Sequence, residues 1–251
     1  MRMRAGRKAG LFLPLAVVVV LIVSMGYFLL HKAMTYPENR WTRLIEKCTK
    51  VAIQAREMSE QGMIHAPINE CQAIGIFPAT ISGGFGIGAE YGQGIIMVRN
   101  GDGWSSPAVF TVAGGSFGWQ IGAQSTDVIL FFMSKPSVDA ILRGKLRLGA
   151  DVSIAAGPIG RNASLSTDAQ FRGGILSYSI SKGLIAGAKL EAGIILENWK
   201  ANRELYGARL SAREILLEGK AQMPKAAYGF MTALEPDNPL ARFLKRFRLM
   251  K

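Results

Sequence analysis

The distribution of glycine constrains the fold of this chain more than any other feature. Of the 29 glycines in 251 residues, 22 fall between residues 70 and 200, among short runs of β-branched and aromatic residues. Glycine inside a strand marks a bulge, a tight bend or a close approach of two backbones. Short strands with glycine-rich turns are typical of antiparallel sandwiches and barrels. The sequence therefore predicts an α+β fold, with an antiparallel β-rich domain that is sandwich or barrel-like and has flanking helices.

Several elements can be placed within this segment. The run 94–99 ends at Asn100-Gly101-Asp102-Gly103, a strong turn signal, and the run 108–112 follows it. A short helix over 136–142 begins with Pro136 and closes at Gly144. Further apolar or alternating runs predict strands over 127–133, 146–156, 175–180 and 184–196.

Amphipathic helices are expected on both sides of the β-rich segment. Apolar residues recur at helical spacing from Trp41 to Ala55, and Ser211-x-x-Glu214 forms a capping box before a second apolar run. The helix over 41–55 either packs its apolar stripe on the domain or lies on a membrane surface. The end of the chain, 240–251, combines an apolar stripe with five basic residues and no acid, which fits a membrane-surface helix or a docked terminal helix.

The N-terminus predicts a membrane anchor. Residues 11–30 are an uncharged run that, at about 1.5 Å per residue, would span about 30 Å of hydrocarbon. A cleaved signal peptide is the alternative, although its apolar region is normally only about 7–15 residues long. Four basic residues precede the run and favour a cytoplasmic N-terminus. The expectation is a single-pass transmembrane protein of the bacterial cytoplasmic membrane, with the main domain in the periplasm.

The charge of the chain lies mainly at its ends. The formal net charge of +12 divides into +4 over residues 1–30, +2 over 31–69, +1 over 70–200 and +5 over 201–251. A nucleic-acid-binding domain would carry its basic surplus on the folded module itself. The nearly neutral middle therefore argues against nucleic acid and for a membrane partner.

None of the motifs considered predicts an enzyme. Gly114-Gly115-Ser116-Phe117-Gly118 matches the nucleophile elbow of hydrolases, but both histidines of the chain lie upstream and no helix is expected after the serine. Five aspartates could in principle pair for acid–base catalysis, but nothing in the sequence selects a pair. The histidines and cysteines lack metal-ligand spacing, so no metal and no cofactor are predicted. The two cysteines, Cys48 and Cys71, either pair in an oxidising compartment or are small buried residues.

Residues about 69–198 resemble the SYLF lipid-binding domain family. The resemblance rests on several collinear motifs, each of them weak alone. In chain order they are Ala73-x-Gly75-Ile76-Phe77-Pro78, Gly84-Phe85-Gly86-x-Gly88, Tyr91-Gly92-x-Gly94, Gly103-Trp104-Ser105-Ser106-Pro107, Gly122-Ala123-Gln124-x-Thr126-Asp127, Gly157-Pro158-Ile159-Gly160-Arg161 and Tyr178-Ser179-x-Ser181-Lys182-Gly183-Leu184.

The resemblance implies binding of acidic phospholipids, which include phosphoinositide-like lipids, rather than catalysis. In the family, an amphipathic helix at the start of the domain and basic residues near it are implicated in membrane contact. The family commonly has basic residues where this chain has Ser82, Gly83, Glu90 and Gln93, which argues against a phosphoinositide pocket on that loop. The expected lipid-binding residues are Arg40, Arg43, Lys47, Lys50, Arg161, Lys182, Arg242, Lys245, Arg246 and Arg248.

The sequence thus predicts five segments and a non-enzymatic binding function. They are a basic N-terminus over 1–10, an anchor over 11–30, a linker and amphipathic helix over 31–68, a SYLF-type domain over 69–198 and a C-terminal helical segment over 199–251. The expected partner is an anionic phospholipid membrane. The alternative is a structural or interaction scaffold of the cell envelope that binds a protein partner.

Overall fold

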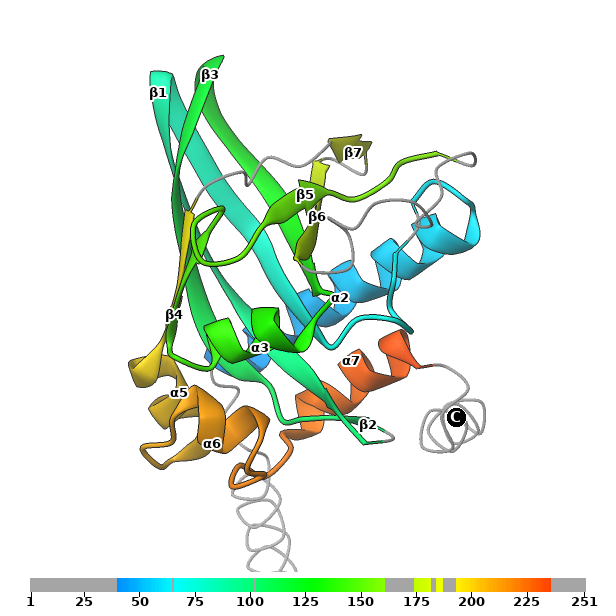
Figure 1. Ribbon diagram of the computed structural model, residues 1–251, viewed down its shortest axis with the longest axis vertical. Coiled ribbons are helices and arrows are strands. Elements are labelled where there is room, and N and C mark those ends of the chain that lie inside the picture. The colour runs from blue at the N-terminus through cyan, green and yellow to red at the C-terminus, as the bar shows by residue number, and fades with distance from the viewer. Residues whose placement is uncertain are drawn as a thin grey trace, which may run out of the picture. The chain divides into compact units, whose positions relative to one another are not determined.

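Helices flank a mostly antiparallel sheet in the part of the chain that the structure describes. The computed structural model describes residues 40–64, 66–101, 103–160, 174–181, 184–186 and 193–235, all within a unit that begins at Arg40. Its elements (Figure 1) are α2 (Arg40–Glu60), β1 (Ala73–Asn100), β2 (Gly103–Trp104), β3 (Ala108–Phe132), α3 (Lys135–Ile141), β4 (Lys145–Leu148), β5 (Ile154–Ala156), β6 (Ile175–Ser181), β7 (Leu184–Ala186), β8 (Gly193–Glu197), α5 (Trp199–Tyr206), α6 (Ala212–Leu216) and α7 (Lys225–Leu234).

Strands β1 and β3 form one long antiparallel hairpin. Their pairing runs from Ala73 opposite Phe132 to Ile96 opposite Ala108. The predicted turn lies at the closed end of this hairpin, beyond Ile96 and Ala108, where Gly101 takes a φ of +56°. The turn and the strands predicted over 94–99, 108–112 and 127–133 are therefore confirmed, although the last two belong to a single strand.

Strand β1 is folded over on itself. In a straight strand, Phe77 and Gly94 would be about 55 Å apart, yet a Cβ on Gly94 would lie 2.6 Å from the Phe77 ring and 2.1 Å from the carbonyl oxygen of Ile76. The bend lies at the shift of register between Gly84 and Gly86, and Figure 1 shows β1 and β3 reaching their tips together. Glycine is required at position 94 because the two halves of β1 touch there.

The folded hairpin is extended on both sides into a nearly closed, barrel-like sheet. Strand β6 pairs with the 127–132 end of β3, and β8 pairs with the 110–114 end. Strand β4 adds to β8, β7 adds to β6, and β5 joins β6 as the parallel pair. The α+β class and the antiparallel, barrel-like sheet with flanking helices are confirmed.

Two hydrophobic cores lie on the two faces of this sheet. Alternate residues of each strand point to opposite faces, so Ile95 and Val109 join one core while Ile96 and Phe110 join the other. The first core lies under α2 and α7, and the second holds the buried side chains of α3 and α6.

Helix α2 packs its apolar stripe on the sheet. Its buried residues are Trp41, Ile45, Cys48, Val51, Ala52, Ala55 and Met58, in one core with strand residues that include Ile74 and Ile76. The prediction of a helix packed on the domain is therefore confirmed. The alternative, in which the apolar stripe rests on a membrane, is wrong because that stripe is already covered by protein.

Local signals fix the ends of α3 and the start of α6. Ser134 caps α3 with a proline in its first turn, and Gly144 after the helix has a φ of +78°. Ser211 and Glu214 form the predicted capping box of α6. The single strand predicted over 146–156 is wrong, because the chain turns at Gly149, whose φ is +81°, and divides the run into β4 and β5.

No helix among the described residues is long and apolar enough to cross a membrane. The longest of them, α2, carries five basic and three acidic residues. The run 11–30, for which a transmembrane helix was predicted, lies outside the described residues. The predicted transmembrane helix is thus without support from the described fold, and the domain boundaries remain predictions.

The contact inside folded β1 yields a stability prediction. Gly94→Ala would push a methyl group into the Ile76 carbonyl, whereas a Cβ on Gly103 meets nothing within 4 Å. We expect Gly94→Ala to lower the free energy of unfolding by about 1–3 kcal/mol and Gly103→Ala to change it far less. Urea unfolding of the two variants measures the difference. Equal stabilities would contradict the folded-over strand.

Candidate functional site

The exposed side of α2 carries a basic strip, made of Arg40, Arg43, Lys47 and Lys50. These residues follow one another at intervals of three and four, so they share one side of the helix, and all four are exposed. None of the ion pairs among the described residues involves Arg43, Lys47 or Lys50. The helix therefore presents three cations to solvent with their charge uncompensated by these pairs.

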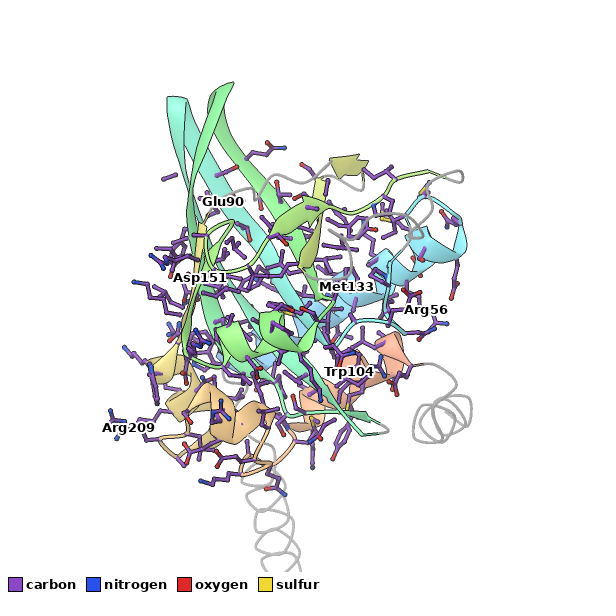
Figure 2. All side chains as sticks on the ribbon, viewed as in Figure 1. Arg56, Glu90, Trp104, Met133, Asp151 and Arg209 are labelled. Atoms are coloured by element: carbon purple, nitrogen blue, oxygen red, sulfur yellow. The ribbon has the colours of Figure 1, made fainter. Side chains whose placement is uncertain are left out.

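Two of the three acids of α2, Glu57 and Glu60, lie beyond the end of the basic strip, whereas Glu46 borders it, three residues after Arg43 and four before Lys50. Glu46, Glu57 and Glu60 are exposed and, like the 43 per cent exposed Ile53, are spaced so that they share another part of the exposed surface. Arg56 lies beside α7, where it pairs with Glu60 and donates to the Ala233 carbonyl (Figure 2). The first half of α2 therefore carries four basic residues and one acid, and the second half carries one basic residue and two acids.

Arg40 differs from the other three residues of the strip. Its Nε is 3.6 Å from a carboxylate oxygen of Glu204 on α5, and its guanidinium lies 4.1 Å from the centroid of the Trp41 ring. Trp41 also donates from Nε1 to Glu204 at 2.7 Å. Arg40 therefore helps to fix the start of α2 against α5, and part of its charge is neutralised.

The remaining predicted lipid-binding residues cannot be placed. Arg161, Lys182, Arg242, Lys245, Arg246 and Arg248 all lie outside the described residues. Two of the positions at which the family commonly has basic residues, Ser82 and Glu90, are buried.

Part of the sheet face that packs on α2 is left uncovered beyond the helix. The next cross-strand pair on the same face as Ile95 and Val109 is Gln93 with Thr111. The pair after that is Tyr91 with Ala113. Leu196 and Ile194 of β8 continue these two rows. We call Tyr91, Ile194 and Leu196 the outer sheet face; Tyr91 is 55 per cent and Leu196 is 38 per cent exposed.

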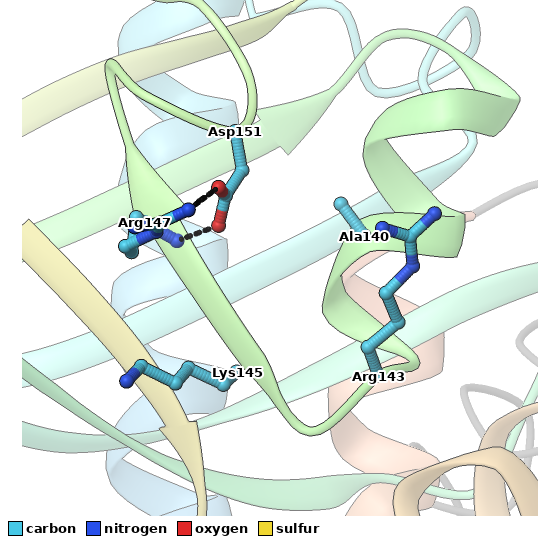
Figure 3. A pocket seen from close by; sticks show the side chains of 5 residues that line it. All are labelled: Ala140, Arg143, Lys145, Arg147 and Asp151. Carbon is cyan, nitrogen blue, oxygen red and sulfur yellow. Dashed lines mark hydrogen bonds and ion pairs between the residues drawn. The ribbon is translucent and has the colours of Figure 1, made fainter.

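A second basic cluster lies between α3 and β4 and was missed by the sequence reasoning. Arg143, Lys145 and Arg147 line a hollow of about 350 Å³ with Ala140 and Asp151 (Figure 3). Lys145 and Arg147 are exposed while Leu146 and Leu148 are buried. The alternation in Lys145-Leu146-Arg147-Leu148 was the available signal, since it places both cations on one side of a strand.

Two of the aspartates considered for catalysis have structural partners. Asp127 accepts a hydrogen bond from the Ala79 N–H at 2.7 Å, at a bulge where Ala79 has a φ of +51°. Asp151 is paired with Arg147, whose hydrogen bonds lower the pKa of that carboxyl. Within the described ranges, no group of three or more histidine, cysteine, aspartate or glutamate residues could hold a metal ion.

Both cysteines are free and buried, so they are the small buried residues of the second alternative. Cys48 lies in the contact between α2 and the sheet, where its Sγ donates to the Ile76 carbonyl. Cys71 donates to the Ile68 carbonyl. Burial raises the pKa of the Cys71 thiol to about 12 and raises that of Cys48 further.

The described residues form a β-rich domain with basic patches on its surface. In a comparison with family models, residues 113–236, about half of the chain, match the Ysc84 family, described as Las17-binding protein actin regulator. This part of the chain belongs to the Ysc84, or SYLF, family, as the sequence motifs predicted.

Curated relatives support the assignment. An SH3 domain-containing protein of Schizosaccharomyces pombe is 38% identical over 156 residues, which cover 61% of this chain and 36% of that protein. Protein YSC84 of Saccharomyces cerevisiae is 35% identical over 159 residues, 62% of this chain and 34% of its own. The human SH3 domain-containing YSC84-like protein 1 is 33% identical over 140 residues, 55% of this chain and 41% of its own. The chain thus spans about a third of the length of the yeast relatives.

The comparisons overturn the predicted location. These relatives are yeast and mammalian proteins named for SH3 domains and for Las17 binding, and the described residues hold no helix that could span a membrane. The prediction of a single-pass protein of the bacterial cytoplasmic membrane with a periplasmic domain is therefore wrong. The names are those of binding and regulatory proteins rather than enzymes.

The buried thiols give a test of how firmly α2 and the loop before β1 are held. In the native chain at mildly alkaline pH, we expect neither Cys48 nor Cys71 to react with a thiol reagent, because burial raises the pKa of both thiols and blocks access. Both should react after unfolding in urea, which serves as the control. Rapid native labelling of Cys48 would show that α2 separates from the sheet.

Proposed function

We propose that this chain binds anionic phospholipid surfaces through the basic strip of α2, without catalysis. The observation that carries the proposal is the row of exposed cations on that helix, outside its buried apolar stripe. Its apolar stripe is buried against the sheet, while Arg43, Lys47 and Lys50 are exposed at helical spacing. Because the apolar stripe faces the protein, contact with lipid is electrostatic.

Magnitudes favour a helix that stays on the sheet when lipid binds. Lifting α2 would uncover strand residues beneath it that include Ile74 and Ile76, and lipid that covered the apolar stripe of the helix would not cover these. Each large buried apolar side chain contributes about 1.5–3 kcal/mol, so exposing these two costs about 3–6 kcal/mol. Each of the three exposed cations gains about 1 kcal/mol near an anionic surface, and this gain does not require the helix to lift. The strip therefore binds in place.

Other parts of the chain supply further basic residues. The helix predicted over 240–251, with Arg242, Lys245, Arg246 and Arg248, would be a second lipid contact. Arg161 and Lys182 extend the same prediction. The resemblance to the SYLF family supports an acidic phospholipid as the ligand, and the +1 balance over residues 70–200 means that the flanking segments carry most of the attraction.

Vesicle binding by two matched triple variants of the full chain tests the proposal. The first replaces Arg43, Lys47 and Lys50 with Gln, and the control replaces the exposed Lys200, Arg213 and Lys225 with Gln. Both lose three positive charges. On phosphatidylserine vesicles we expect the α2 variant to bind about a hundredfold more weakly than the native chain. We expect the control variant to lose much less affinity. Equal losses would mean that only net charge matters, and would refute a site on α2.

A protein partner is the second candidate function, and the outer sheet face favours it. Tyr91, Ile194 and Leu196 are exposed or half-exposed apolar residues, and Leu196 and Ile194 pair with the cations Lys145 and Arg147 of β4. Interfaces are enriched in aromatic residues and arginine. A relative of this chain is named LAS seventeen-binding protein 3, so a protein such as Las17 is the partner to test.

The matching experiment is a pull-down of purified Las17 by the full chain in detergent. The double variant Tyr91→Ser with Leu196→Ser should weaken binding about tenfold or more, since exposed apolar anchors dominate such interfaces. Tyr228→Ser with Leu217→Ser, which alters the same residue types at comparable exposure elsewhere, is the control. Binding that both doubles leave unchanged would exclude the outer sheet face.

A further inference from the structure

The hollow between α3 and β4 is positively charged, and neither function proposed above makes use of this charge. Three cations, Arg143, Lys145 and Arg147, line it with one carboxylate, that of Asp151. The lining therefore carries a net charge of +2. Among the described residues no ion pair compensates Arg143 or Lys145.

The backbone around the hollow is held firmly although its side chains are exposed. Gly144 turns the chain after α3, and its carbonyl accepts a hydrogen bond from the Glu197 N–H of β8. Strand β4 is anchored by Leu146 and Leu148, which are buried in the second core, together with the buried side chains of α3 and α6. The Cα positions of Lys145 and Arg147 are consequently fixed about 7 Å apart on one side of the strand.

Asp151 orients Arg147 toward this space. The turn at Gly149 brings Asp151 back onto β4, where its carboxylate accepts from the Arg147 N–H at 2.7 Å and from Nη2 at 2.9 Å. Arg143 lies across the hollow from this pair in Figure 3. An arginine held by a carboxylate on one edge still has donors on the other edge, so it can contribute to an anion site.

We propose that this hollow binds a phosphate monoester group. Such a group carries a charge of about −1.5 to −2 near neutral pH, which balances the net +2 of the lining. Its oxygens suit the fork of donors on an arginine, and a lysine adds a point charge. The volume of about 350 Å³ admits a phosphate with part of the molecule that bears it. This site is separate from the α2 strip and does not rest on it.

The bearer of the phosphate is either a small soluble ester or a lipid headgroup. Lys145 pairs across the ladder with Leu196, and Arg147 pairs with Ile194. The cations therefore adjoin the apolar rows of the outer sheet face, which would suit a phosphate attached to an apolar group. Two ligands separate the sources: glycerol 3-phosphate in solution, and phosphatidylcholine vesicles that contain phosphatidic acid.

The test uses titration calorimetry on the full chain and two matched doubles. Arg143→Gln with Lys145→Gln removes two cations of the hollow, and Lys135→Gln with Lys225→Gln removes two exposed cations elsewhere. The first double should bind the phosphate ligand at least about tenfold more weakly than the native chain, with the control close to the native value. All four residues are exposed, so both doubles should fold, and thermal unfolding checks this.

The outcomes are distinct. Weakening of glycerol 3-phosphate binding assigns the hollow to phosphate esters in general, while weakening on vesicles alone assigns it to a lipid headgroup. If the first double binds both ligands as tightly as the control does, or if the native chain binds neither ligand, the proposal is overturned. The triple variant of α2 keeps this hollow intact, so failure of lipid binding through α2 would not produce either result.

Discussion

The contact between the two halves of β1 is the constraint on which the rest of the structure depends. Gly94 allows the strand to lie against Ile76, and Gly92 likewise lies against Thr80, where a Cβ would come within 2.4 Å of Oγ1. This closeness turns a long hairpin into a two-layered sheet with an inner and an outer core. Helix α2 lies over the outer core, which is the first of the two cores described above. The Cys48 Sγ of this helix donates a hydrogen bond to the carbonyl of Ile76, the residue that Gly94 approaches. The position of the basic strip therefore follows from glycines far from it in the sequence.

The packing of α2 decides what kind of lipid contact the chain can make. A helix with a free apolar stripe would insert into the acyl boundary, but here the stripe completes a protein core. Only charge remains for the exposed side, which makes the contact sensitive to salt and to the anionic lipid content of the surface. Arg40, which pairs with Glu204, serves the fold as much as the surface.

Much of the fold could be predicted from local patterns, because those patterns act over a few residues. The stripe of α2, the turn at Gly101, the cap at Ser134 and the capping box at Ser211 all depend on neighbours in sequence. The fold-over of β1 could not be predicted, because it joins residues about 17 apart that carry no mutual signal. The strand expected over 146–156 failed for a related reason: its alternation continues through Gly149, where the backbone turns.

The candidate sites show the same limit. The strip Arg40, Arg43, Lys47 and Lys50 could be predicted from helical spacing as a basic side of the helix. That the apolar stripe packs on the sheet rather than on lipid became clear only from the structure. The hollow at Arg143, Lys145 and Arg147 depends on a turn that brings Asp151 back to Arg147. No local sequence pattern predicts that contact. The basic ends of the chain were readable as charge alone.

Hydrogen exchange of α2 on and off phosphatidylserine vesicles tests the central claim most directly, since the claim is that this helix binds lipid while it remains packed on the sheet. The account predicts that the backbone amides of Ile45, Cys48 and Val51 keep their protection when the chain is bound, and that high salt releases the chain. Loss of protection along α2 on binding would contradict it, because the helix would then have left the sheet to place its apolar stripe in the lipid.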